Sequence, residues 1–156
     1  MARNTTLAAG TGTLTAAADP ANTDAITIGD LVYTWVTTPS SAFDVDVGAT
    51  RQGSLDNMVL AINLTGTPGA TTYHTATTEN PYVTAVRSDD TIVLTARVKG
   101  KTGITTTTSE TDITFGAATL TGTGIVADFL SGLVDLNQLN GEVLSELNYL
   151  CTEIDP

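Results

Sequence analysis

His74 and Cys151, the only histidine and the only cysteine of the chain, are residue types that can form a nucleophile and its base. Such a pair works only if the two side chains meet in space beside a group that orients the imidazole. His74 lies in a polar stretch rich in Thr and Gly, and Cys151 lies near the C-terminus in a region of helical spacing. We therefore expect a solvated histidine, a cysteine on a helix face and no enzymatic activity.

Two further patterns could bind a charged ligand. Asp44 and Asp46 alternate along a predicted strand, so their carboxylates project from one face about 7 Å apart and could share a hard cation such as Ca²⁺. Because calcium prefers six or more oxygen ligands, a solvated acidic strand face is favoured, and an ion there stays undecided. The tripeptide G-K-T at residues 100–102 is similar to the end of a phosphate-binding loop, but Thr95 stands where that motif begins with glycine. We expect a turn there, and neither a metal nor a cofactor.

The charge balance limits the classes of partner. The 156 residues include 6 Lys and Arg against 17 Asp and Glu, which gives a formal net charge of −11. A negative field repels phosphate backbones and anionic lipids, so neither nucleic acid nor a membrane is expected as a partner. Hydrophobic residues make up 41% and charged residues 15%, the composition of a folded domain. The sequence shows no secretion signal or membrane span, and its single cysteine forms no internal disulfide.

These residues must be positioned by a β-rich scaffold. Residues 25–36, A-I-T-I-G-D-L-V-Y-T-W-V, read as two strands joined by a Gly-Asp turn. Tyr33 and Trp35 in this hairpin are expected in the core, although they could also stack a ligand. Residues 64–80 are polar and turn-rich and suggest a long surface loop. Further strands are expected at residues 11–17, 43–47, 82–87 and 91–98. Edge strands or extended loops are expected at residues 105–108, 113–115 and 118–121.

Two segments have helical spacing. Near residues 54–63, Ser54 can cap a helix that carries Leu55, Met58 and Ile62 along one face. Beyond residue 124, apolar residues recur at spacings near three and four, which is typical of a short heptad repeat. The seam residues of this repeat are Phe129, Leu133, Leu136, Asn140, Val143, Leu147 and Leu150. The width of the apolar stripe favours a homotrimer or docking onto the β domain, and a polar residue in the seam can fix the alignment of helices.

The elements together predict an α+β fold that is mainly β. We expect an antiparallel β sandwich or sheet with one short helix packed on it and a C-terminal helical tail. Residues 1–10 form an N-terminal arm, residues 11–124 a β-rich domain with its helix near 54–63, and residues 125–156 the helical tail. Whether the arm orders before assembly is left open.

Four segments resemble a module found in structural proteins of tailed bacteriophages. They are I-T-I-G-D-L-V-Y-T-W at residues 26–35, D-V-D-V-G-A-T-R-Q-G-S-L-D-N-M-V-L-A-I-N at 44–63, and P-Y-V-T-A with T-I-V-L-T-A-R-V-K-G-K-T-G-I at 81–85 and 91–104. The likeness covers about residues 11–123. It departs from the usual pattern at Val47, where Ile is frequent, and at Ile104, where Asn is usual.

The resemblance implies a structural role in a virion assembled in the host cytoplasm, and it transfers no active site. It favours a capsid decoration, or cement, protein that binds the major capsid protein or other virion proteins and stabilises the outer shell. The first alternative is a tail, baseplate or fibre-attachment component. The second is a host-surface module in which the loop at residues 64–80 and Trp35 hold a glycan or a cation.

Overall fold

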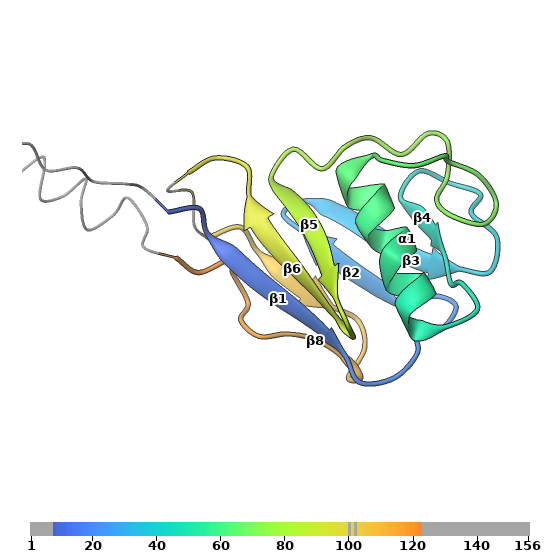
Figure 1. The fold of residues 1–156 in the computed structure, drawn as a ribbon, viewed down its shortest axis with the longest axis horizontal. Coiled ribbons are helices and arrows are strands. Elements are labelled where there is room, and N and C mark those ends of the chain that lie inside the picture. The colour runs from blue at the N-terminus through green and yellow to red at the C-terminus, as the bar shows by residue number, and fades with distance from the viewer. Residues whose placement is uncertain (1–7, 100, 102, 123–156) are drawn as a thin grey trace, which may run out of the picture.

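A computed structural model describes residues 8–99, 101 and 103–122 of the chain (Figure 1). These residues form a mainly β fold with a single helix, as the sequence predicts. In chain order the elements are β1 (Thr11–Ala16), β2 (Ala25–Ile28), β3 (Leu31–Val36), β4 (Asp44–Asp46), α1 (Arg51–Asn63), β5 (Val83–Ser88), β6 (Thr91–Ala96), β7 (Thr106–Thr108) and β8 (Ile113–Phe115).

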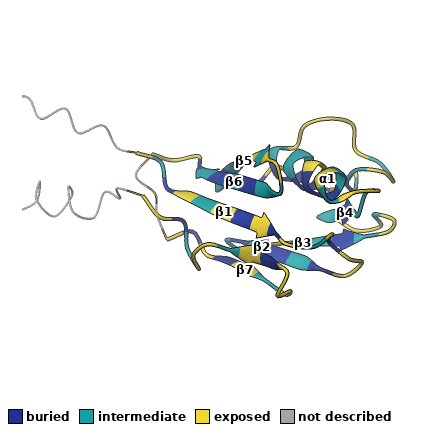
Figure 2. Ribbon diagram, turned by 60° about the horizontal axis from the view of Figure 1, so that its bottom comes forward, coloured by how far each residue is buried: buried dark blue, intermediate teal, exposed yellow. Residues whose placement is uncertain are grey.

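The strands form two four-stranded sheets that face each other. Sheet A has the strand order β5-β6-β1-β8, and sheet B has the order β4-β3-β2-β7. Alternate side chains of both sheets are buried in one core, among them Leu14 and Leu94 of sheet A and Trp35 of sheet B. Figure 2 shows the alternation of buried and exposed positions along β1. This alternation is the period-two pattern of strands with one face on a core and one on solvent. The expectation of a β sandwich is confirmed.

The β2–β3 hairpin forms as predicted. Ile28 pairs with Leu31 across the two-residue turn at Gly29 and Asp30, and Gly29 has φ +68°. A positive φ at the first turn position is what a glycine supplies at no steric cost. A second hairpin joins β5 to β6, with Ser88 paired to Thr91, where the sequence indicates one.

The helix starts earlier than predicted. Its N-cap is Thr50, whose side chain accepts a hydrogen bond from the Gly53 N–H at 3.1 Å, and α1 runs from Arg51. Ser54, the predicted cap, is instead buried inside the helix, where its hydroxyl donates to the main-chain carbonyls of Thr50 and Val47. A threonine caps as a serine does, so the residue type could not decide between the two positions. The predicted apolar face is confirmed for the buried Leu55, Met58 and Ile62, which close the open side of the sandwich between β4 and β5.

One strand pairing differs from the antiparallel expectation. β4 runs parallel to β3, with Thr34 opposite Asp44 and Val36 opposite Asp46. Parallel neighbours usually need a long crossover connection. Here the connection is short because β4 pairs only with the last half of β3, and the chain reverses through Phe43, which has φ +66°.

Residues 64–80 contain no helix or regular strand, yet they are more than a surface loop. Tyr73 and Asn80 are buried, and Tyr73 pairs with Val45. The Asp46 N–H donates to the Thr72 carbonyl at 2.7 Å, so the loop covers the outer edge of β4. The loop therefore packs against the edge strand of sheet B, whereas the sequence predicts a polar loop on the surface.

The short segments after β6 also form as expected. β7 lies at the edge of sheet B and β8 at the edge of sheet A. After β8, Thr119 pairs with Thr105 and Thr121 pairs with Thr11 as isolated bridges. None of the helices in the described part of the chain is both long and apolar enough to span a membrane.

Candidate functional site

The seam residues lie outside the described residues. The same holds for Cys151, for residues 1–7 of the predicted arm and for the predicted tail at residues 125–156. Docking through the seam and the favoured homotrimer therefore stay predictions. His74 is described, and its Nδ1 accepts a hydrogen bond from the Ala76 N–H at 3.1 Å. This contact stabilises a turn of the 64–80 loop.

The carboxylates of Asp44 and Asp46 are both engaged by main-chain groups. Asp44 Oδ2 accepts from the N–H groups of Ser40 and Ser41 at 2.9 and 2.7 Å. Asp46 Oδ2 accepts from the Gly48 N–H at 2.9 Å, beside an open cleft of about 600 Å³ between β4 and α1. Within residues 8–122 no three His, Cys, Asp or Glu side chains gather as metal ligands would. The two aspartates hold the turns before and after β4.

The hairpin aromatics belong to the core. Tyr33 and Trp35 have no exposed surface, and Trp35 Nε1 donates to the Ser54 carbonyl at 3.1 Å. Burial raises the pKa of Tyr33 to about 12, although its hydrogen bond from Asn80 partly offsets that rise. Trp35 therefore offers no face on which a glycan could stack, and the host-surface alternative loses the aromatic on which it depends.

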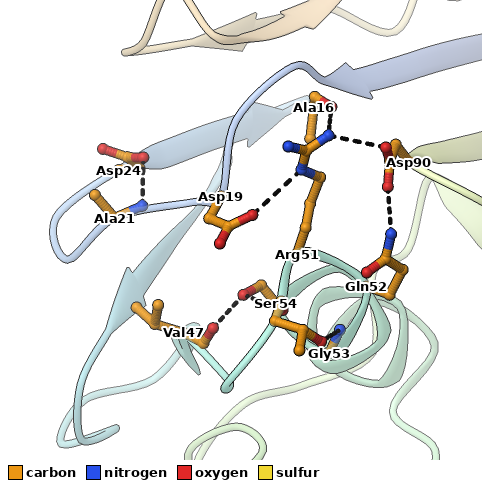
Figure 3. Close-up of polar contacts among 11 residues, drawn as sticks. Ala16, Asp19, Ala21, Asp24, Val47, Arg51, Gln52, Gly53, Ser54 and Asp90 are labelled. Carbon is orange, nitrogen blue, oxygen red and sulfur yellow. Dashed lines mark hydrogen bonds and ion pairs between the residues drawn. The ribbon is translucent and has the colours of Figure 1, made fainter.

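Arg51 forms a polar cluster at the start of α1 (Figure 3). Its Nε lies 3.3 Å from Asp19 Oδ1, and its Nη1 lies 2.8 Å from Asp90 Oδ2 and 3.4 Å from the Ala16 carbonyl oxygen. Gln52 Nε2 donates to the other oxygen of Asp90 at 2.6 Å. Through these three acceptors the guanidinium of Arg51 joins the start of the helix to the turns that contain Asp19 and Asp90.

Asn80 joins both sheets to the helix. Its Oδ1 accepts from the N–H groups of Tyr82 and Val83, and its Nδ2 donates to the Tyr33 hydroxyl at 3.2 Å. Its main-chain N–H donates to the Ile62 carbonyl at 3.0 Å. A buried amide with all these partners is typical of a structural node. Sequence reasoning missed it, because an Asn in a polar loop carries no signal of burial.

The two ends of the described chain meet. Thr11 and Thr121 exchange two main-chain hydrogen bonds of 2.6 and 2.8 Å. A Cβ placed on Gly122 would lie 3.0 Å from the Gly10 Cα, and the Gly10 carbonyl accepts from the Ala96 N–H at 2.7 Å. Gly10, assigned to the arm by the sequence, therefore belongs to the sheet. Both described ends leave the domain at one place (Figure 1).

The outer face of sheet A carries no charged side chain. Strand registers place three rows of outward side chains across the sheet, each from three or four strands. These side chains are Thr11, Thr13, Thr15, Thr84, Val86, Ser88, Thr91, Val93, Thr95 and Thr114. By contrast, the outer face of sheet B carries Asp44 and Asp46 on its edge strand. In a chain of net charge −11, an uncharged face of this kind is suited to contact with protein, since the centres of protein interfaces are depleted of charged residues.

Comparisons with known proteins identify no family for this chain. No protein-family model matches it, and no curated protein sequence is significantly similar. Function therefore has to be argued from the residues and the geometry.

Proposed function

We propose that the protein is a non-catalytic structural component of a tailed-phage virion, and within it a capsid decoration protein. In this role it binds the major capsid protein on the outside of the assembled shell and stabilises that shell. The resemblance of residues 11–123 to the phage module supports the class of protein. The uncharged outer strands of sheet A, and polar side chains such as Asn80 that bind within the domain, support a role based on shape and contact.

One observation carries the proposal: the two ends of the described residues meet beside Thr11 and Thr121. Residues 8 and 122, the first and last residues that the structure describes, both lie near this end of the domain, which we assign to attachment. The rest of the sandwich, tied together by Asn80 and Arg51, then projects away as one body. An attachment end opposite a projecting domain is the arrangement that a subunit on a closed shell requires.

Shell stabilisation would follow from linkage. A subunit that binds only the assembled lattice lowers the free energy of that lattice at each occupied site, by RT ln(1 + [L]/Kd). The negative charge of the subunit also keeps it from binding the packaged nucleic acid by phosphate contacts. No bond-making step is needed for this function.

Localisation in purified virions tests the proposal. Heads and tails are separated and each fraction is searched for the protein by quantitative mass spectrometry, with the major capsid and tail-tube proteins as internal standards. We expect the protein in the head fraction, at a fixed ratio to the major capsid protein. Recovery with the tails would favour the tail, baseplate or fibre alternative, and absence from virions would overturn both.

A further inference from the structure

The cleft of about 600 Å³ between β4 and α1 has room for a ligand. Small or apolar residues make up part of its lining, namely Val47, Gly48, Ala49 and Gly53. Gly48 has φ +61°, and a Cβ placed on it would lie 2.9 Å from the Ser54 nitrogen. The chain therefore lies close against the helix at Gly48, and no side chain projects from this residue into the cleft.

The charged residues that line this cleft are both acidic. They are Asp46 and Asp56, and none of the described residues in the lining is Lys, Arg or His. Asp46 makes no ion pair with a described residue, because its partners are the Gly48 N–H at 2.9 Å and the Asn57 amide. Asp56 gives one of its two oxygens to Arg87. A cleft lined by one sign of charge concentrates the electric field, so it attracts a cation.

Asn57 adds a neutral acceptor to the same lining. It is 9% exposed, and its Nδ2 donates to the main-chain carbonyl of Asp46 at 3.2 Å. Its Oδ1 accepts no hydrogen bond from a residue that the structure describes, yet none of the fully buried side-chain N and O atoms of these residues lacks a partner. This oxygen is therefore accessible, and the cleft is the space that Asn57 lines. Among the described residues, Asp46 Oδ1 and Asp56 Oδ2 likewise have no donor.

We propose that the cleft binds a lysine or arginine side chain presented by a segment of a partner protein. The head group of such a side chain has several N–H donors and no acceptor, which complements the oxygens of Asp46, Asp56 and Asn57. Its methylene stem packs on apolar surface such as that of Val47 and Ala49.

Other cations fit this cleft less well. A hard metal ion needs more oxygen ligands than two carboxylates supply, and within the described residues no three His, Cys, Asp or Glu side chains gather around one point. A second copy of the chain is disfavoured because two molecules of net charge −11 repel each other. The cation therefore comes from a different protein.

Binding of a cationic segment goes beyond the proposed function and does not rest on it. β4 and α1 lie at the opposite end of the domain from the start of β1, where the described ends meet (Figure 1). The cleft thus stays open when the protein is attached through that end. Failure of one proposal leaves the other standing.

The test measures binding of a fluorescein-labelled peptide, Ala-Lys repeated three times, to the full chain by fluorescence anisotropy. The same peptide with Gln in place of Lys is the control probe. We expect Asp46→Asn to raise the Kd for the lysine peptide about tenfold, because the cation loses a charged acceptor. The matched control is Asp112→Asn, which removes an equal charge from an exposed residue of the turn between β7 and β8. Its Kd should stay within about twofold of the wild-type value.

A second pair of variants tests the shape of the cleft without a change of charge. Ala49→Leu narrows the cleft and should raise the Kd about fivefold, because the peptide side chain then meets an extra isobutyl group. Ala117→Leu adds the same group at an exposed residue after β8 and should bind the peptide as the wild type does.

Folding of each variant is checked by the fluorescence of the buried Trp35. Should Asp46→Asn fail to fold, Asp56→Asn replaces it. Equal weakening by the cleft variant and by Asp112→Asn would mean that overall charge attracts the peptide, which overturns the proposal. So does the absence of binding to the wild type, wild-type affinity in Ala49→Leu, or a Gln peptide that binds as tightly as the lysine peptide. Light scattering that gives the mass of two chains for the wild type and of one for Asp46→Asn would make a second copy the occupant and also overturns it.

Discussion

The side chain of Asn63 pairs with the main chain of Ala85 as a neighbouring strand would. Asn63 Nδ2 donates to the Ala85 carbonyl at 2.7 Å, and Asn63 Oδ1 accepts from the Ala85 N–H at 2.9 Å. The last residue of α1 thus provides hydrogen-bond partners for the main-chain N–H and C=O groups in the middle of β5, the edge strand of sheet A. An edge strand left unpaired would be a template for association with another chain.

Replacing Asn63 by Ala should lower the free energy of unfolding by about 1 to 3 kcal/mol, because both Ala85 main-chain groups lose their partner. Urea denaturation measures the change. Asn22→Ala is the control, since Asn22 accepts only one bond, from the exposed Thr37 N–H at 3.0 Å. Asn22→Ala should lower the free energy of unfolding by less than about 0.5 kcal/mol. Equal losses in the two variants would contradict the role given to Asn63.

Gly29→Ala should be costly for two separate reasons. Gly29 has φ +68°, and a Cβ there would lie 2.6 Å from the Tyr82 ring. We expect a loss of about 1 to 3 kcal/mol in the free energy of unfolding. Adding Tyr82→Ala to Gly29→Ala should remove the steric part and leave the backbone part, as a double-mutant cycle would show.

Gly69→Ala provides the control for that cycle, because no atom lies within 4 Å of its added Cβ. Its unfolding free energy should stay within about 0.5 kcal/mol of the wild type or rise slightly. A Gly29 variant as stable as the Gly69 variant would mean that the β2–β3 turn does not pack against Tyr82.

Arg51→Ala should lower the free energy of unfolding by about 1 kcal/mol, because its guanidinium bridges Asp19 and Asp90 while 27% exposed. Arg51→Lys should restore only part of this, since an ammonium group cannot contact two carboxylates and a carbonyl in the same fork. The stability difference between the wild type and Arg51→Ala should decrease as salt is added. The comparison is Arg87→Ala, which removes one ion pair, to Asp56, from a side chain of similar exposure, and a larger loss there would contradict the prediction.

Stability should fall with alkaline pH because of Tyr33. Burial raises its pKa from 10.0 to about 12, so between those values the unfolded chain loses the phenol proton while the folded chain keeps it. The unfolded state then binds fewer protons, and the free energy of unfolding decreases as pH rises, in total by roughly 2 to 3 kcal/mol. Well below pH 10, Tyr33 is protonated in both states and does not make the free energy of unfolding depend on pH.

Urea unfolding of the wild type and of Tyr33→Phe, followed from pH 9 to pH 12, checks this. The variant should be less stable at pH 9, where it lacks the hydrogen bond from Asn80, and should lose less stability as pH rises. Parallel curves for the two proteins would show that Tyr33 is not the group responsible.

Much of the fold follows from local pattern. Strand-forming residues and turn signals indicated β1 to β6, and the segments of β7 and β8 were expected as edge strands or extended loops. The Gly29-Asp30 pair located the turn that joins β2 to β3. The buried face of α1 followed from the spacing of Leu55, Met58 and Ile62. These features depend on neighbours in sequence, so a single chain is enough to predict them.

What sequence reasoning missed depends on partners distant in sequence. The parallel pairing of β4 with β3, and the burial of Tyr73 and Asn80 in a polar loop, arise from contacts that no local period encodes. Asn63 looks like an ordinary helix end until its pairing with Ala85 is seen. The uncharged outer face of sheet A was visible as Thr and Val at alternate positions, but only the strand registers show that they form one surface.

The most direct measurement is the thermal stability of purified phage shells that lack this protein, followed by calorimetry as the protein is added back. We expect the melting temperature of the shell to rise with protein concentration and to level off when the lattice sites are filled. The protein should sediment with the shells over the same range. A shell transition that stays unchanged, with the protein left in the supernatant, would contradict a capsid decoration role.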